Sequence, residues 1–356
     1  MDEFASIRLW TERRQSAVWQ AGRGVALGIG DDAALLDPAL PAEGIEGPRH
    51  IVAAVDTMVE TVHFTRRTMT DEDIGYKALA ANVSDIAAMG GVPLHALVSV
   101  SVPKSYGPER VRRLYDGLYA CAERYGVAVV GGDTTSSPEH LVVAVPLLGA
   151  VEAGGALRRS GARPGDAVVL TGPVGMSAAG LHWLLAQPAA GEGAIDAAAA
   201  GEAAALVQAH RRPSPSVRAG RLLRARGSCR ALNDVSDGLA SEAWELAEAS
   251  GLRIVLRERD LPLAGSMAAY ARRIGASPLD WMLYGGEDYV LLGTVAAEDA
   301  EPLRDLFRQE GLPFFIIGET AAGEPGVDLV TGGEGWSGTA SARVIPLRKR
   351  GYNHFA

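Results

Sequence analysis

Short acidic clusters, most of them beside glycine, follow the apolar, strand-like runs of this 356-residue chain. They span residues 28–32, 55–57, 84–85, 131–135, 233–238 and 285–288. Carboxylates at strand ends and tight turns repel one another unless a cation lies among them, and Mg²⁺ is bound in proteins by a few carboxylates together with substrate phosphates. The pattern therefore favours a magnesium and phosphate site built from several strand ends. The simpler explanation is that each Asp caps a turn or a helix.

Strand-like and helix-like patterns alternate along the chain. Strands are predicted at residues 51–55, 97–102, 127–130, 141–145, 168–170, 254–256, 289–292 and 314–317, where β-branched and apolar residues concentrate. Helices are predicted over 73–89 and 239–249, each followed by glycine. This alternation predicts a mixed α/β and α+β architecture. The turn at 161–166 predicts a domain junction, so we expect an N-terminal domain over residues 1–152 and a C-terminal domain over 153–356.

The composition restricts the classes of partner. A hydrophobic content of 47% with 22% charged residues is typical of a soluble globular protein. The formal charge of -9 argues against nucleic acid, which binds a basic face. The longest apolar stretch, 141–151, is too short to span a bilayer, so no membrane partner is expected. The isolated cysteines Cys121 and Cys229, and an N-terminus without a signal-peptide pattern, predict a cytoplasmic location.

None of the lysines, Lys77, Lys104 and Lys349, lies in a G-x-x-x-x-G-K-[ST] loop. A Walker A nucleotide site is therefore excluded. If the chain binds ATP, metal ions and arginine must hold the phosphates.

The order and spacing of the motifs resemble the thiamine-monophosphate kinase family, in the superfamily that also holds aminoimidazole ribonucleotide synthetase. The matching segments are 28–36, 55–64, 76–90, 131–135, 159–166, 234–239, 285–289 and 351–355, which extend over almost the whole chain. The resemblance implies a two-domain aminoimidazole ribonucleotide synthetase-like fold whose N-terminal domain pairs sheet edges in a homodimer. It also implies ATP-dependent phosphorylation of thiamine monophosphate to thiamine diphosphate, with ADP as co-product.

The resemblance implies a role for each matched residue. Six aspartates are implied to bind Mg²⁺ ions: Asp32, Asp56, Asp85, Asp133, Asp234 and Asp237. The implied contacts to ATP are Tyr115, Gly132, Asp133, Arg159 and Ser236, and those to thiamine monophosphate are His63, Glu287 and Tyr352. No general base is implied, because the acceptor is already an ionised phosphate and phosphoryl transfer depends mainly on positioning and charge neutralisation.

Ordinary structural roles compete with these assignments. Asp85 could be an exposed helix acid, and Ser236 or Asp237 could cap the helix that begins near Leu239. Tyr115 and Tyr352 could serve packing alone. His63 could be a structural histidine, and Arg159 could be a surface residue.

Three positions depart from the family pattern. Ala54-Val55 stands where the family often has Ser-Thr, so a hydroxyl ligand is lost. Thr61 replaces a frequent glycine, and Asn353 replaces the usual aspartate near the C-terminus.

Other members of the superfamily fit less well. Selenophosphate synthetase expects a reactive cysteine in a glycine-rich N-terminal segment, whereas the first cysteine here is Cys121. A hydrogenase-maturation relative would end in a reactive cysteine, whereas this chain ends in Phe355-Ala356. A non-catalytic binding protein on the same scaffold is the competing hypothesis from a different class.

Overall fold

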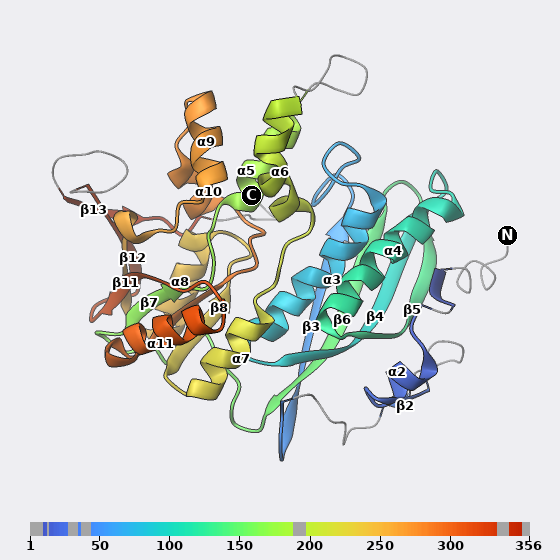
Figure 1. The fold of residues 1–356 in the computed structure, drawn as a ribbon, viewed down its shortest axis with the longest axis horizontal. Helices are drawn as coiled ribbons and strands as arrows, with labels where there is room; N and C mark the ends of the chain where they lie inside the picture. The colour runs from blue at the N-terminus through green and yellow to red at the C-terminus, as the bar shows by residue number, and fades with distance from the viewer. Residues whose placement is uncertain are drawn as a thin grey trace. The chain divides into compact units, whose positions relative to one another are not determined.

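The computed structural model describes residues 10–12, 14–27, 35–36, 44–187, 197–332 and 342–350. The chain divides into two compact units, each with its own sheet and helices (Figure 1). The first contains Met1–Ile86 and Gly91–Gly155, and the second contains Ala87–Gly90 and Ala156–Ala356. The domain boundary predicted after residue 152 stays a prediction.

A four-stranded sheet forms the centre of the first unit. Its strands are β3 (Arg49–Val59), β4 (Val92–Pro103), β5 (Ala128–Ser137) and β6 (Val142–Glu152), in the order β3-β6-β4-β5. β6 runs antiparallel to β3 and β4, whereas β4 and β5 are parallel. β3 and β5 are therefore the edge strands. The short sheet of β1 (Val25–Leu27) and β2 (Leu35–Leu36) and the helix α2 (Ala17–Ala21) also belong to this unit.

Two helices, α3 (Asp71–Ala88) and α4 (Pro108–Tyr125), lie side by side over one face of this sheet (Figure 1). A glycine lets their backbones meet, since a Cβ on Gly75 would lie 1.8 Å from the carbonyl oxygen of Leu114. α3 confirms the helix predicted over 73–89. It begins with a reciprocal cap in which the Asp73 N–H donates to Thr70 Oγ1 and the Thr70 N–H donates to the Asp73 carboxylate, both at 3.2 Å.

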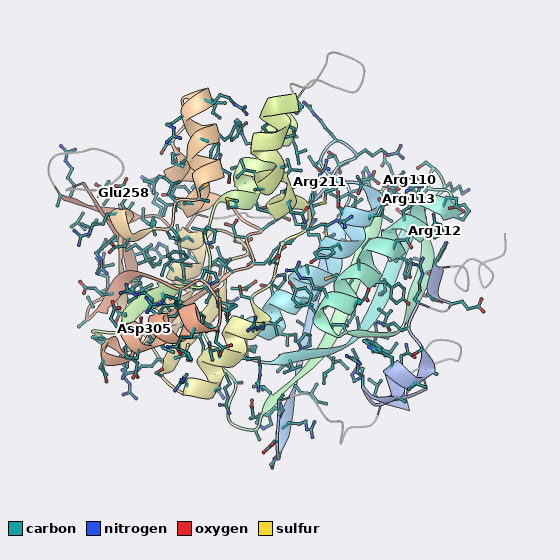
Figure 2. The ribbon with its side chains drawn as sticks, in the orientation of Figure 1. Arg110, Arg112, Arg113, Arg211, Glu258 and Asp305 are labelled. Atoms are coloured by element: carbon teal, nitrogen blue, oxygen red, sulfur yellow. The ribbon has the colours of Figure 1, made fainter. Side chains whose placement is uncertain are left out.

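Asp71, the first residue of α3, is bound by two arginines of α4. Arg110 and Arg113, labelled in Figure 2, donate to its carboxylate at 2.6 Å and 2.7 Å. Burial acts to raise the pKa of Asp71, but the hydrogen bonds and charges of the two arginines outweigh it and hold that pKa below its usual value. This ion-pair cluster ties the start of α3 to α4.

The second unit is built on a seven-stranded sheet in the order β13-β12-β9-β11-β7-β10-β8. The strands are β7 (Ala167–Leu170), β8 (Cys229–Asp234), β9 (Arg253–Arg257), β10 (Leu291–Val295), β11 (Phe315–Ala321), β12 (Gly326–Thr331) and β13 (Arg343–Leu347). The helices are α5 (Met176–Ala186), α6 (Ala197–Arg211), α7 (Val217–Arg226), α8 (Leu239–Ser250), η1 (Glu258–Asp260), α9 (Gly265–Ile274), α10 (Pro278–Tyr284) and α11 (Ala297–Gln309). β9 and β12 pair in parallel, whereas the other pairs described in this sheet are antiparallel.

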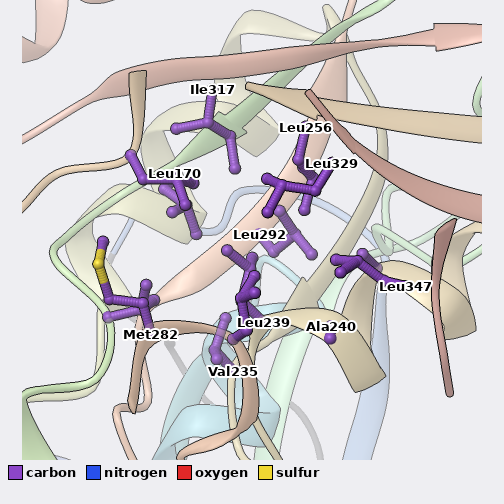
Figure 3. Packing of buried hydrophobic residues seen from close by; sticks show 14 of the residues in the cluster. Leu170, Val235, Leu239, Ala240, Leu256, Met282, Leu292, Ile317, Leu329 and Leu347 are labelled. Atoms are coloured by element: carbon purple, nitrogen blue, oxygen red, sulfur yellow. The ribbon is translucent and has the colours of Figure 1, made fainter. Parts of the chain in front are cut away.

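Helices cover both faces of this second sheet. Successive residues of a strand point to opposite faces. Leu170 and Leu292 accordingly pack in one apolar cluster with residues of α5, α6, α8, α9 and α10, part of which Figure 3 shows. Val169 and Leu291 pack in another cluster, with residues of α7 and α11. The predicted mixed fold class is confirmed.

Candidate active site

Two of the predicted motifs dock onto each other in the second unit. β8 pairs with β10 up to Asp234 opposite Leu291, and backbone hydrogen bonds continue beyond the strands. The Glu287 N–H donates to the Ser236 carbonyl oxygen at 2.6 Å, and the Tyr289 N–H donates to that of Val235 at 2.9 Å. The structure therefore brings the segment 234–237 and Glu287 to the same end of two neighbouring strands.

A glycine makes this close approach possible. A Cβ on Gly286 would lie 2.4 Å from the carbonyl oxygen of Ser236, which is closer than real Cβ contacts come. The next residue, Glu287, has a φ of 66°, a left-handed conformation that non-glycine residues rarely adopt. The packing of the two motifs therefore fixes the backbone of Glu287 in an uncommon conformation.

Glu242 of α8 joins the polar groups of segment 233–237. Its buried carboxylate accepts hydrogen bonds from Asn233 Nδ2 at 2.5 Å, from the Asp237 N–H at 3.0 Å and from Ser236 Oγ at 3.4 Å. Burial raises the pKa of Glu242 to about 8, and the negative charges of Asp234 and Asp237 add to the rise. Both aspartates thus lie close enough to Glu242 for their charges to disfavour its ionised form.

Neither Ser236 nor Asp237 caps the helix α8 that follows them. The N-cap of α8 is Gly238, and no side chain caps this helix. The hydrogen-bonded acid is instead Glu242, in the first turn of α8. Sequence reasoning missed Glu242 and Asn233, since the only local signal was an acid one helical turn after the motif.

Arg159 is attached to the same network. Its Nε donates to Asn233 Oδ1 at 3.1 Å, and its Nη1 lies 3.4 Å from a carboxylate oxygen of Glu245. The side chain is nevertheless 54% exposed. Arg159 is therefore a surface residue, but the hydrogen bond to Asn233 also holds its guanidinium beside the acidic segment.

The glycine-rich turn at 171–175 holds a carboxylate of the protein itself. Asp288 accepts hydrogen bonds from the Gly175 N–H at 2.5 Å and the Ser177 N–H at 3.1 Å, at the N-terminus of α5. Burial raises the pKa of Asp288 to about 7, although these hydrogen bonds favour its ionised form. A helix N-terminus is a ready anion site, and here Asp288 occupies it.

In the first unit, Asp56 lies beside α3. The Asp56 N–H on β3 donates to Asn82 Oδ1 at 2.8 Å, and the buried Asn82 in turn donates from Nδ2 to the Ala78 carbonyl oxygen at 3.0 Å. Asp85 is partly buried and follows Asn82 by three residues, so it lies on the same side of the helix. Asp56 and Asp85 therefore both lie near Asn82, and their role in binding metal stays a prediction.

Asp133 lies elsewhere in that unit, exposed on the edge strand β5 and paired with Ser99 of β4. β3 and β5 are at opposite edges of the sheet. Strands are spaced about 4.8 Å apart, so the three steps between these edges put roughly 14 Å between Asp133 and Asp56. Among the described residues, no group of three or more His, Cys, Asp or Glu side chains is placed to hold a metal ion.

Gly132, the residue before Asp133, has no space for a side chain. A Cβ there would lie 1.9 Å from the carbonyl oxygen of Val98. Only glycine fits this position without a shift of the backbone, and Gly132 is exposed beside Asp133.

Tyr115 and His63 have well-defined structural partners. Tyr115 is buried and stacked on Trp10 with ring centroids 5.8 Å apart, and burial raises its pKa to about 12. His63 Nδ1 accepts the Val59 N–H at 3.0 Å in a turn where Thr61 has a φ of 70°. Their substrate roles stay predictions. Asp32, Tyr352 and Asn353 lie outside the described residues.

The part of the chain that the structure describes contains no helix with the length and apolar character needed to cross a bilayer. Cys121 and Cys229 are both buried free thiols.

Two family models match the chain. The model for AIR synthase related protein, N-terminal domain, matches residues 30–151, and that for the C-terminal domain matches residues 163–330. Together they match well over half of the sequence.

Similarity to known proteins extends over the full length. The chain is 40% identical to the thiamine-monophosphate kinase of Bacillus subtilis over 100% of both sequences. The crystal structure of thiamine-monophosphate kinase from Stenotrophomonas maltophilia superposes with a TM-score of 0.77 at 32% identity, covering 90% of this chain and 96% of that one. The structure of AaThiL complexed with AMPPCP and TMP has a TM-score of 0.73 at 31% identity, covering 99% and 97%. The chain therefore belongs to the thiamine-monophosphate kinase family of AIR synthase related proteins.

Proposed function

We propose that this chain transfers a phosphoryl group from ATP to thiamine monophosphate, giving thiamine diphosphate and ADP. The observation that carries the proposal is the docking of segment 234–237 against Glu287, which puts acidic groups and a predicted acceptor contact at one end of β8 and β10. Full-length similarity to thiamine-monophosphate kinases supports the same reaction. AaThiL, at 31% identity, is known in complex with AMPPCP and TMP.

Carboxylate oxygens are the donor type that supports Mg²⁺ as the bound ion. This ion takes oxygen ligands and few protein carboxylates, and the second unit has Asp234 and Asp237 near Glu242, whose pKa is raised by burial and further by their charges. Asp234 and Asp237 would hold ions in this unit, and Asp56, Asp85 and Asp133 would do so in the first, together with Asp32. When bound, Mg²⁺ would neutralise charge on the ATP phosphates.

The chain's own residues would position the two substrates. Arg159, fixed through Nε to Asn233 but 54% exposed, has donors available for an ATP phosphate. Ser236, Gly132 and Tyr115 would contribute the other nucleotide contacts, and Gly132 would do so through its backbone. His63, Glu287 and Tyr352 would hold thiamine monophosphate. Because the acceptor phosphate is already ionised, no side chain has to remove a proton from it.

We also propose a homodimer formed through the first sheet. On the edge strand β3, Ile51 is 69% and Val55 is 61% exposed, and they lie on the same face because they are four residues apart. Leu97 of β4 adds a side chain that is 41% exposed. Open edges with exposed apolar residues are normally covered.

Light scattering coupled to gel filtration tests the homodimer. A dimer is expected at micromolar concentration, and Val55→Glu should shift it toward monomer. A fully active monomer would refute this proposal. The cytoplasmic location also stays a proposal, supported by the two free thiols.

An ADP-release assay with four acceptors tests the function: thiamine monophosphate, thiamine, an aminoimidazole precursor and selenide. We expect ADP release that depends on thiamine monophosphate, with thiamine inactive because its alcohol needs a general base. Equal activity with thiamine, or with another acceptor, contradicts the assignment. No ADP release with any acceptor would favour a non-catalytic binding protein.

A further inference from the structure

A buried histidine lies against the predicted acceptor contact Glu287. His210, in the last turn of α6, is 1% exposed. Its Nδ1 is 3.5 Å from Glu287 Oε2 and 3.1 Å from Ser177 Oγ. No motif in the sequence marks this histidine, and α6 lies outside the segments that carry the family resemblance.

The helices fix the histidine in place. α5 and α6 pack side by side (Figure 1), and a Cβ on Gly180 of α5 would lie 2.1 Å from the Leu206 carbonyl oxygen and 3.2 Å from His210 Cβ. This contact leaves no space for α6 to shift toward α5. Ser177 is held independently, because its N–H donates to Asp288 at 3.1 Å.

Glu287 is held from two directions. Its N–H donates to the Ser236 carbonyl oxygen at 2.6 Å, which fixes the backbone at a φ of 66°. Its side chain, 27% exposed, has one carboxylate oxygen beside the imidazole. A carboxylate with a fixed neighbour on its inner side samples fewer orientations and presents its remaining oxygen in a defined direction.

We propose that His210 is a positioning residue for recognition of the acceptor. With its proton on Nδ1, the imidazole faces Glu287 Oε2 and orients that carboxylate toward thiamine monophosphate, and Ser177 Oγ, as the second acceptor at Nδ1, fixes the plane of the ring. This inference rests on the proposed function, in which Glu287 contacts the acceptor. It predicts an effect on acceptor binding that passes through Glu287 and leaves ATP binding unchanged.

Two substitutions of His210 separate the contact made by Nδ1 from the packing of the ring. His210→Phe keeps an aromatic ring but removes Nδ1, whereas His210→Asn places an amide nitrogen near the position of Nδ1. We expect His210→Phe to raise the KM for thiamine monophosphate about tenfold, with kcat and the KM for ATP within about twofold of the parent. His210→Asn should recover most of this loss. His182→Phe, on the neighbouring helix α5, is the matched control, since its Nδ1 bonds Tyr270 at 2.8 Å.

A double-mutant cycle tests the route through Glu287. In a Glu287→Gln background, His210→Phe should have little further effect on the KM for thiamine monophosphate. An unchanged KM in His210→Phe, an equal rise in the KM for ATP, or full additivity with Glu287→Gln would overturn the inference.

If His210→Phe does not fold, Ser177→Ala decides, because it removes the hydroxyl but keeps the N–H bond to Asp288. We then expect the KM for thiamine monophosphate to rise about two- to threefold, as for the loss of one weak neutral hydrogen bond. No rise rejects the proposal.

The activity of the parent protein distinguishes a failure of the proposed function from a failure of the positioning role of His210. If it releases no ADP with thiamine monophosphate, the proposed function fails before His210 is considered. If it is active and the His210 variants match the parent, the positioning role alone fails.

Discussion

Asp237 and Asp133 have the same predicted role, metal binding, but the two units hold them differently. Asp237 lies in a hydrogen-bonded network around the buried Glu242, whose partners come from segment 233–237. Asp133 is exposed on an edge strand, roughly 14 Å from Asp56 by strand spacing. The second unit therefore preorganises Asp237 beside a buried acid at an electrostatic cost, whereas the first leaves Asp133 exposed and apart from Asp56. We therefore expect substitutions of the acids in the first unit to change mainly kcat, and substitution of Glu242 in the second unit to change mainly the free energy of unfolding.

The largest expected effect is on catalysis in the first unit. Asp133→Asn and Asp85→Asn should each lower kcat by about two orders of magnitude or more, because each carboxylate would hold an Mg²⁺ ion whose charge stabilises the reacting phosphates. Steady-state kinetics with ATP and thiamine monophosphate measures this, and circular dichroism checks the fold. Excess EDTA should abolish turnover, and Mg²⁺ should restore it.

Glu139→Gln is the matched control for these variants, since this exposed acid lies just beyond β5. It should keep the parent rate. Near-normal turnover in both aspartate variants would remove the metal assignment in the first unit.

The next effect is on stability in the second unit. Glu242→Ala removes the acceptor of Asn233 Nδ2 and of the Asp237 N–H, and we expect a loss of about 2–4 kcal/mol in the free energy of unfolding. Glu242→Gln keeps one acceptor oxygen and should lose less. Asp133→Asn should change stability by less than about 0.5 kcal/mol, as exposed substitutions do.

Urea denaturation of these three variants measures the contrast. Equal losses for Glu242→Ala and Asp133→Asn would mean that the two units do not differ in preorganisation.

The pH dependence of stability should have opposite signs for two buried acids. Burial acts to raise the pKa of Asp71, but Arg110 and Arg113 outweigh it and lower that pKa. The contribution of Asp71 to stability is therefore present above the unfolded value of 3.8 and is lost as the pH falls through the lower folded value. Burial raises the pKa of Asp288 to about 7, so its contribution is present below 3.8 and is lost as the pH rises through 7.

Two asparagine variants measure these contributions. Relative to Asp288→Asn, the parent should lose stability between about pH 4 and about pH 7, by at most about 1.4 kcal/mol per pH unit. Relative to Asp71→Asn, the parent should lose stability below about pH 4. Urea midpoints across this range provide the test. A flat difference for Asp288→Asn would show that the helix N–H groups outweigh burial.

The smallest effect compares two residues with left-handed backbone, Thr61 in the first unit and Glu287 in the second, with φ of 70° and 66°. Replacement by glycine removes a conformational cost of about 1–2 kcal/mol from the folded state. It also stabilises the unfolded state by about 0.5–1 kcal/mol, because glycine has more conformational freedom there. Thr61→Gly should therefore raise the unfolding free energy slightly, without a change in KM.

Glu287→Gly should give a similar gain in stability but raise the KM for thiamine monophosphate. Thermal denaturation and kinetics of the pair test this. A destabilised Thr61→Gly would show that its side chain makes contacts worth more than the strain.

Patterns within one segment predicted much of the fold. The apolar runs at 168–170 and 254–256 became β7 and β9, and the helical spacing over 73–89 became α3. β8 was missed because Cys229–Asp234 contains no β-branched residue and ends in two polar side chains. Those side chains are buried, and Asn233 finds its partners in Arg159 and Glu242, which no local pattern reveals.

The site shows the same limit. The spacing of Asn82 and Asp85 predicted their common face, and Asp56 lies there. The separation of Asp133 from Asp56 depends on strand order, which a strand pattern does not specify. Likewise, His210 meets Glu287 only through the packing of α6.

The carboxylate of Asp288 in the turn at 171–175 has a consequence for inhibitor design. It reaches this turn from a position 113 residues away in sequence, and the fold holds it there by N–H hydrogen bonds. A tethered ligand acts at an effective concentration in the millimolar range or above. A phosphate-mimicking compound aimed at these N–H groups would have to compete with that internal occupant, so selective compounds are better directed at the exposed donors of Arg159.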